Sequence, residues 1–258
     1  MNPAVRTSRK LAAIGAWGLL LLTAALPSPS RGAEKAQIYG GLLFTFSKIG
    51  GSSFDGHSIN EVSGVIAPIP RLDRAPGFGA AVGVRGEIFG VELGYVFSSI
   101  KGNVFDPTPE VAGSRPATSA THSFNVDFKF HFWPQQTLGA YAFGGLSIVL
   151  LNVKKDFFGQ EATGLKPGSS TEYNYVWKAF GDVDFFGMGI DLGAGLEVAL
   201  GSRLVLTGGV LFRPTFFSSV NLKPYDTAFE TTVSDFSVSG MTGINFGLTL
   251  GLQYYFSK

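Results

Sequence analysis

Several charged residues of this sequence stand at alternate positions within apolar segments. Glu92 lies between Val91 and Leu93, and Asp127 and Lys129 alternate with phenylalanines. Successive side chains of a β-strand point to opposite faces, so each charge shares a face with small or polar residues. The set predicted on that face is Arg85, Glu87, Glu92, Asp127, Lys129, Asp191 and Glu197.

Enzymatic chemistry has little support in the sequence. Its three histidines are His57, His122 and His131, and they do not have the spacing of metal ligands. Neither a Walker loop nor a dinucleotide fingerprint is present. We therefore expect no catalytic residue, no metal and no cofactor, and we predict that the protein is not an enzyme.

The elements that must position these charges are long alternating segments. Eight of them are predicted as strands: 37–46, 78–89, 91–98, 123–132, 138–150, 186–200, 204–213 and 244–256. Soluble strands average about 5 or 6 residues, so segment 186–200 is long for a soluble sandwich and suits a tilted membrane strand. No apolar run after the N-terminal one reaches the roughly 18 residues of a membrane helix.

The connections between these segments alternate strictly in length. Long connections span 47–76, 99–121, 151–184 and 214–242, and short ones span 90, 133–137 and 201–203. Transmembrane barrels have short periplasmic turns and long outer loops, whereas a Greek-key sandwich has no reason to separate lengths in this way. We predict an all-β fold: a single closed antiparallel up-and-down transmembrane β-barrel of about eight strands, with four long extracellular loops. A soluble β-sandwich is the alternative fold.

The N-terminus indicates export. Arg6, Arg9 and Lys10 precede an apolar run at 11–26, and prolines and small residues follow. This order is typical of a secretory signal peptide, predicted at 1–33, with the barrel domain at 34–258. The sequence contains no cysteine, which excludes a lipid-anchoring cysteine. Removal of the signal leaves 16 basic residues against 19 acidic ones, which argues against a nucleic-acid partner.

Three segments carry a family resemblance: the hairpin 86–95, the strand 193–198 and the terminal segment 251–256. They resemble the eight-stranded outer-membrane β-barrel superfamily of Gram-negative bacteria, which includes OmpA-, OmpX- and OmpW-like proteins. The resemblance implies the cell outer membrane as location, with outer-membrane lipid and lipopolysaccharide as surroundings. The terminal aromatic Phe256 resembles the signal read by the barrel-assembly machinery, although Ser257 and Lys258 follow it here.

Three functions stay open. The first is a non-enzymatic barrel with a structural or surface-interaction role through long outer loops that contact a surface partner. The second is a narrow channel or conduit for small apolar or ionic solutes. The third is a lipid-modifying enzyme, because His122 and Ser123 resemble the histidine and serine pair of outer-membrane lipid A deacylases; in those enzymes one position separates the pair on a single face, whereas here the residues are adjacent.

Inside so narrow a barrel the charges must pair to offset desolvation. The predicted interior set is therefore a salt-bridged plug or the lining of a pore. Aromatic residues near strand ends favour the bilayer interface, and the predicted girdle is Tyr39, Tyr95, Trp133, Tyr141, Tyr254 and Phe256. Aromatic residues of the long connections would form either a packed cap or anchors for a partner; they are Phe157, Phe158, Tyr173, Tyr175, Trp177, Phe180, Phe216, Phe217 and Tyr225.

Overall fold

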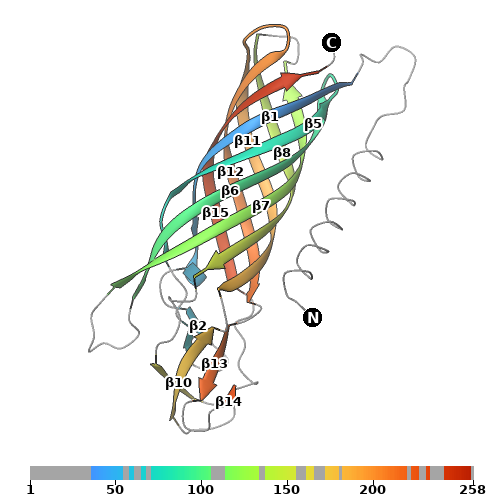
Figure 1. Ribbon diagram of the computed structural model, residues 1–258. Helices are drawn as coiled ribbons and strands as arrows, with labels where there is room; N and C mark the ends of the chain where they lie inside the picture. Colours follow the sequence, from blue (N-terminus) through green and yellow to red (C-terminus); the bar gives the residue numbers. More distant parts are fainter. Residues whose placement is uncertain are drawn as a thin grey trace, which may run out of the picture.

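A computed structural model shows a closed antiparallel β-barrel with smaller sheets beyond one end (Figure 1). The structure describes residues 36–54, 58–60, 65–67, 71–105, 114–133, 137–154, 161–165, 172–179, 182–219, 222–226, 231–232 and 241–256. The predicted signal peptide at 1–33 lies outside the described residues and stays a prediction. Among the described residues, no helix is both long and apolar enough to cross a membrane.

Eight long strands form the barrel wall. In order around the barrel they are β1 (Gln37–Gly50), β5 (Ala75–Arg85), β6 (Phe89–Phe105), β7 (Ser114–Phe132), β8 (Leu138–Val153), β11 (Val183–Ala199), β12 (Leu204–Ser219) and β15 (Met241–Tyr255). Each strand pairs antiparallel with the next, and β15 pairs with β1 to close the barrel. The predicted fold class is confirmed.

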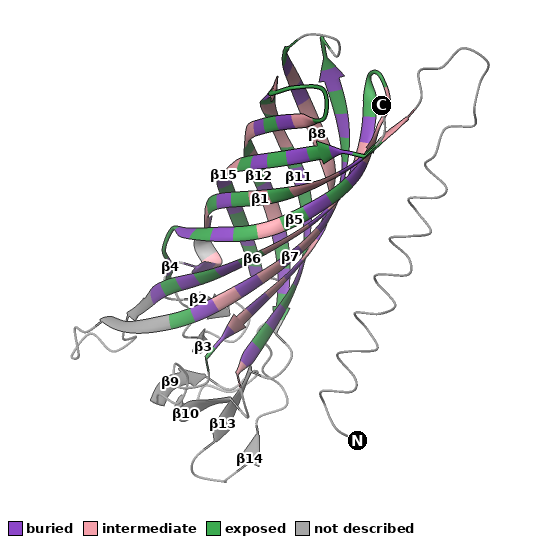
Figure 2. Cartoon of the chain, turned by 45° about the horizontal axis from the view of Figure 1, so that its top comes forward, coloured by how far each residue is buried: buried purple, intermediate pink, exposed green. Residues whose placement is uncertain are grey.

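Side chains alternate regularly across this wall. Along β15, buried and exposed residues follow each other almost without interruption, and the same alternation is visible on the other strands (Figure 2). This is the period of two that a pleated strand imposes. The inner face therefore collects one half of each strand, and the outer face collects the other half.

Three short connections lie at one end of the barrel, which we call the inner end. They join β5 to β6, β7 to β8 and β11 to β12, and β1 begins and β15 ends on the same side. The first turn differs from the prediction, which placed it at Gly90: Gly90 pairs with Arg85, and the turn spans 86–88. The Gly86 N–H donates to the Phe89 carbonyl at 2.8 Å and closes this turn.

At the opposite, outer end the strands run further than predicted. β6 extends to Phe105 and β7 begins at Ser114, so most of the predicted loop 99–121 is strand. Polar and small residues such as Ser119 and Thr121 continue the ladder there, because main-chain pairing does not require an apolar outer face. Periodicity of apolar residues alone therefore missed these extensions.

The long connections contain structure of their own. The first holds η1 (Ser52–Phe54), β2 (Ser58–Asn60), β3 (Val65–Ala67) and β4 (Arg71–Leu72). β9 (Glu161–Leu165), β10 (Glu172–Ala179), β13 (Leu222–Asp226) and β14 (Thr231–Thr232) form a four-stranded sheet beyond the outer end. Of the predicted loop aromatics, Tyr173, Tyr175 and Trp177 belong to β10, Tyr225 to β13, and Phe216 and Phe217 to β12, whereas Phe157, Phe158 and Phe180 lie outside the described residues.

Candidate functional site

The barrel interior holds most of the buried polar side chains, and inner-face glycines give its large rings room. A Cβ atom at Gly83 would lie 2.4 Å from Cζ of Tyr39, and one at Gly195 would lie 2.6 Å from Cζ of Tyr141. Any larger residue at these two glycines would therefore displace the ring beside it. Both tyrosines are buried inside the barrel, so their assignment to the interface girdle was wrong.

Glu92 on β6 is the centre of a polar cluster near the inner end. It accepts hydrogen bonds from Nζ of Lys129 on β7 at 2.6 Å and from the Tyr39 hydroxyl at 2.8 Å. A third comes from Nε2 of Gln253 on β15 at 3.2 Å. Charge-assisted bonds of this kind are stronger than neutral ones, and together they hold Glu92 in place although it is buried.

A second ion pair crosses the barrel at this end. Arg85 on β5 donates to both carboxylate oxygens of Glu197 on β11, at 2.7 and 3.0 Å. In the strand order β11 is the fourth strand from β5, which is the opposite side of an eight-stranded barrel. Nδ1 of His131 lies 3.3 Å from the same carboxylate, and Arg85 also donates to the Tyr255 hydroxyl at 3.2 Å. These side chains occupy the width of the interior.

Asp191 on β11 forms the third buried pair, further toward the outer end. Nε and Nη2 of Arg213 on β12 each donate to one of its oxygens at 2.6 Å. The hydroxyl of Ser147 on β8 adds a bond at 2.8 Å. Asp191 has no exposed surface, so this fork of donors is what offsets its desolvation.

Asp127 on β7 differs from the other interior carboxylates because no cation contacts it among the described residues. Its Oδ2 accepts a hydrogen bond from Asn125. Its Oδ1 has no hydrogen-bond partner in the described part of the chain, and the same holds for Oδ1 of Asn245 and Oγ1 of Thr45. Buried polar atoms normally have a partner, so a water or a small polar solute suits these three oxygens.

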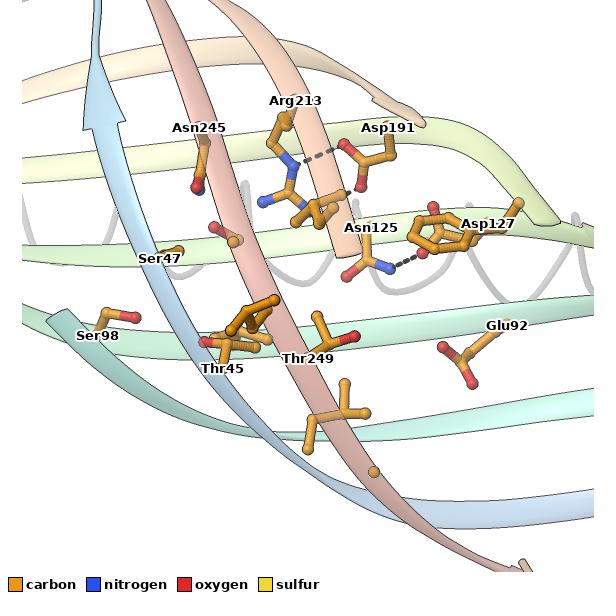
Figure 3. Close-up of a pocket in the computed structure, with 18 of the residues that line it drawn as sticks. Thr45, Ser47, Glu92, Ser98, Asn125, Asp127, Asp191, Arg213, Asn245 and Thr249 are labelled. Carbon is orange, nitrogen blue, oxygen red and sulfur yellow. Dashed lines mark hydrogen bonds and ion pairs between the residues drawn. The ribbon is translucent and has the colours of Figure 1, made fainter. Parts of the chain in front are cut away.

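These residues line a cavity that reaches from the inner cluster toward the outer end (Figure 3). Its lining includes Glu92 and Lys129 as well as Ile49 and Ile100. About 70 Å³ is accessible to the centres of water molecules. One water needs roughly 10–15 Å³ in this measure, so the cavity has room for about five waters.

At the outer end of the cavity, the interior becomes mostly apolar. Phe54 of η1 packs edge-on against Phe217 of β12, with ring centroids 5.4 Å apart. The buried apolar side chains that fill this end, here called the apolar layer, are Ile49, Phe54, Leu72, Ile100, Leu151, Val153, Val183, Phe185, Phe217 and Met241. Leu151, Val183 and Phe185 have no exposed surface, so solvent does not reach them.

The structure brings most of the predicted interior set together. It places Arg85, Glu92, Asp127, Lys129, Asp191 and Glu197 inside the barrel. Glu87 is the exception: it lies exposed in the turn 86–88, where strand alternation no longer applies. The predicted interior set did not include Arg213, His131, Gln253 and Tyr255. Each of them lies on the inner phase of its strand, so the alternation of side chains could have indicated them.

The remaining predicted girdle residues face outward. Trp133, Tyr254 and Phe256 are exposed near the inner end, and the rings of Tyr254 and Phe256 pack with centroids 5.6 Å apart. Tyr95 is half-buried on the outer face of β6, with its hydroxyl 2.9 Å from Nδ1 of His122. Ser123, next to His122, is buried on the inner face. The two residues of the proposed deacylase-like pair therefore lie on opposite sides of the wall.

The outer face of the barrel is a continuous apolar surface. Thirty-two large apolar side chains are exposed among the described residues, most of them on this face, whereas soluble monomers rarely expose a contiguous apolar patch larger than a few hundred Å². An outward-facing apolar band is typical of a transmembrane barrel. Closure also pairs every wall strand on both sides, as a bilayer demands. The protein is a β-barrel of the bacterial outer membrane.

Comparisons with known proteins give structural likeness only. No protein-family model and no curated protein matches the sequence. Similar solved structures include outer membrane protein OprG from Pseudomonas aeruginosa, with 13% identity and a TM-score of 0.48 over 88% of this chain and 98% of that one. Others are Neisserial surface protein A (12%, TM-score 0.43, 86% and 99%) and outer membrane protein AlkL (14%, TM-score 0.45, 90% and 95%). The strand pairing of this outer-membrane barrel itself establishes its fold.

Proposed function

We propose that the protein is a non-enzymatic outer-membrane barrel with a closed interior, whose extended strands and loop sheet contact partners at the cell surface. The observation that carries the proposal is the Arg85–Glu197 pair, which joins opposite sides of the barrel. The Glu92 cluster lies next to it, and the apolar layer fills the other end. A plug of this kind stabilises an anchor and leaves no open path for solutes.

The surface role is supported by the outer end. The wall strands continue beyond the predicted loop boundaries, and the sheet of β9, β10, β13 and β14 extends further still (Figure 1). The non-enzymatic part is supported by the placement of His122 and Ser123 on opposite faces. Mass spectra of lipid A test this part of the proposal. Identical spectra from cells that produce the wild type and from cells that produce Ser123→Ala would agree with a non-enzymatic role. A lipid A modification that is present with the wild type and lost in the variant would contradict it.

Conductance in planar bilayers tests the closed interior. We expect no single-channel steps from the wild type, and steps from the double variant Arg85→Ala, Lys129→Ala, which removes the two cations of the inner plug. Lys154→Ala, an exposed outer-end lysine, serves as the matched control and should be as silent as the wild type. Regular steps from the wild type would overturn the proposal.

A narrow conduit for small ions is the second candidate, favoured by the cavity and its charges. Four carboxylates face three permanently charged cations among the described interior residues, and Asp127 borders the cavity without a cation in contact. If the barrel conducts, potassium efflux from loaded liposomes should fall in Asp127→Asn. Liposomes containing the wild type that retain potassium as well as protein-free ones would remove this candidate.

A further inference from the structure

A group of basic side chains lies on the outer surface near the outer end of the barrel. Four of them face outward there: Lys48 of β1, Arg71 of β4, Arg74 between β4 and β5, and Lys101 of β6. One carboxylate, Asp73, lies among them. We call the four cations the basic band. None of them forms an ion pair with another described residue.

Strand register brings the band together. Ser47 of β1 pairs with Ala75 of β5, so Lys48 lies level with Arg74 one position further out. The Asp73 N–H donates to the Lys101 carbonyl at 2.9 Å, which places Arg74 beside Lys101 as well. Arg71 pairs with Asn103, two residues beyond Lys101 on the same strand. The four cations therefore occupy neighbouring positions on adjacent strands.

A β-bulge turns these residues outward. The pairing of β4 with β6 and the pairing of β5 with β6 differ in register by one residue, so Asp73 and Arg74 together oppose Lys101. Both are exposed, whereas Leu72 and Ala75 on either side are buried. Without the extra residue, regular alternation would direct one of the two side chains into the barrel.

The band lies at the outer edge of the apolar surface. On β1 the exposed residues Ile38, Leu42, Phe44 and Phe46 precede Lys48. The ten steps along the strand from Ile38 to Lys48 rise roughly 25 Å, at about 3.3 Å per step and a tilt of about 40°. This rise matches the height of a barrel's apolar band. Lys48 thus lies where the lipid headgroups begin.

At the ends of β8 and β11, the charges on this edge are arranged differently. On β8 and β11, Lys154 pairs with Asp182 at 2.7 Å, and Asn152 donates to Asp184 at 2.8 Å. Acidic groups therefore accompany the cation on that side, and cations without an ion-pair partner in the described chain gather on the side of β1, β5 and β6.

We propose that the basic band binds the phosphate groups of lipopolysaccharide in the outer leaflet. Lipopolysaccharide carries its phosphates at the boundary between acyl chains and sugars, the level at which the band lies. Arginine binds phosphate oxygens through two parallel donors, and lysines add positive charge and further donors. The inference rests on the location in the outer membrane and is independent of the closed interior.

The test measures how lipopolysaccharide raises Tm, followed as the loss of the compact form on unboiled gels. The variant is Lys48→Gln, Arg71→Gln, Arg74→Gln, Lys101→Gln; the control is Lys154→Gln, Arg203→Gln, which removes two exposed basic residues elsewhere. Each basic residue near an anionic surface contributes about five-fold in affinity. The variant should need about 600-fold more lipopolysaccharide for the same shift, and the control should match the wild type.

Three results would overturn the proposal: an unchanged response in the four-residue variant, an equal response of the wild type to dephosphorylated lipopolysaccharide, or a full shift with inorganic phosphate alone. The first would mean that the band does not bind, the second that acyl chains or sugars are recognised, and the third that the site takes free phosphate. If the four-residue variant does not give a compact form, Arg74→Gln, Lys101→Gln carries the test, with an expected loss of about 25-fold.

Discussion

The two ends of the barrel interior are filled by opposite kinds of side chain. At the inner end, Arg85, Glu197, Glu92 and Lys129 meet across the barrel in ion pairs and hydrogen bonds. At the outer end, the apolar layer packs without charges. A charged filling holds only while each partner is present, because a lone buried charge is costly, whereas an apolar filling depends on volume.

The largest effect should come from Arg213→Met. This change leaves the fully buried Asp191 with Ser147 as its remaining partner, and we expect a loss of about 3–5 kcal/mol in the free energy of unfolding. Urea unfolding in detergent micelles measures it. The double variant Arg213→Met, Asp191→Leu should recover most of the loss, and a single variant that loses less than about 1 kcal/mol would contradict the importance of pairing.

A smaller loss is expected from Leu151→Ala in the apolar layer. Leu151 has no exposed surface, so its truncation removes buried methyl groups and leaves a cavity, at a cost of about 3 kcal/mol. Leu151→Met, which nearly conserves volume, should cost less than about 1.5 kcal/mol. The same urea titration measures both variants. Equal losses of unfolding free energy for the two would show that side-chain volume does not govern stability at the outer end.

Tyr39→Phe should have a moderate effect at the inner end. It removes one of three donors to Glu92, while Lys129 and Gln253 stay in place. A hydrogen bond to a charged group contributes about 1.5–3 kcal/mol, and we expect the lower end of that range because two donors remain. A loss of unfolding free energy as large as that of Arg213→Met would mean that Lys129 and Gln253 do not compensate for the missing hydroxyl donor.

The smallest effect should come from Lys154→Gln. Its ion pair with Asp182 is largely exposed, and exposed pairs contribute about 0–1 kcal/mol. The midpoint of urea unfolding should hardly move at either low or high salt. A loss comparable with that of Arg213→Met would show that burial does not separate the two classes of ion pair in this barrel.

Local pattern predicted much of this structure but not its turns. Alternation of apolar residues located all eight wall strands, and the alternation of connection lengths separated the inner end from the outer end. Glu87 was placed inside because residues 84–88 continue the period of two, yet hydrogen bonding between Gly86 and Phe89 ends the strand first. Backbone hydrogen bonds determine where a three-residue turn forms, and the pattern of side chains indicates such a turn only weakly.

Tyr39 and Tyr141 show two different reasons for error. For Tyr39 the residue type favoured the interface, although outward Ile38 and Leu42 already placed position 39 on the inner face. For Tyr141 the pattern is ambiguous, because apolar residues of 138–150 occur in both phases. Only the barrel shows that Gly195, on the neighbouring strand, leaves space for that ring.

Within the wall strands, the sequence by itself determined which face most residues occupy, because the pleat repeats every two residues whatever the rest of the chain does. It could not determine which charges meet. Arg85 and Glu197 are 112 positions apart and lie on strands that are not neighbours. Their contact depends on how closure of the barrel staggers one strand against the next, and this stagger belongs to the whole sheet.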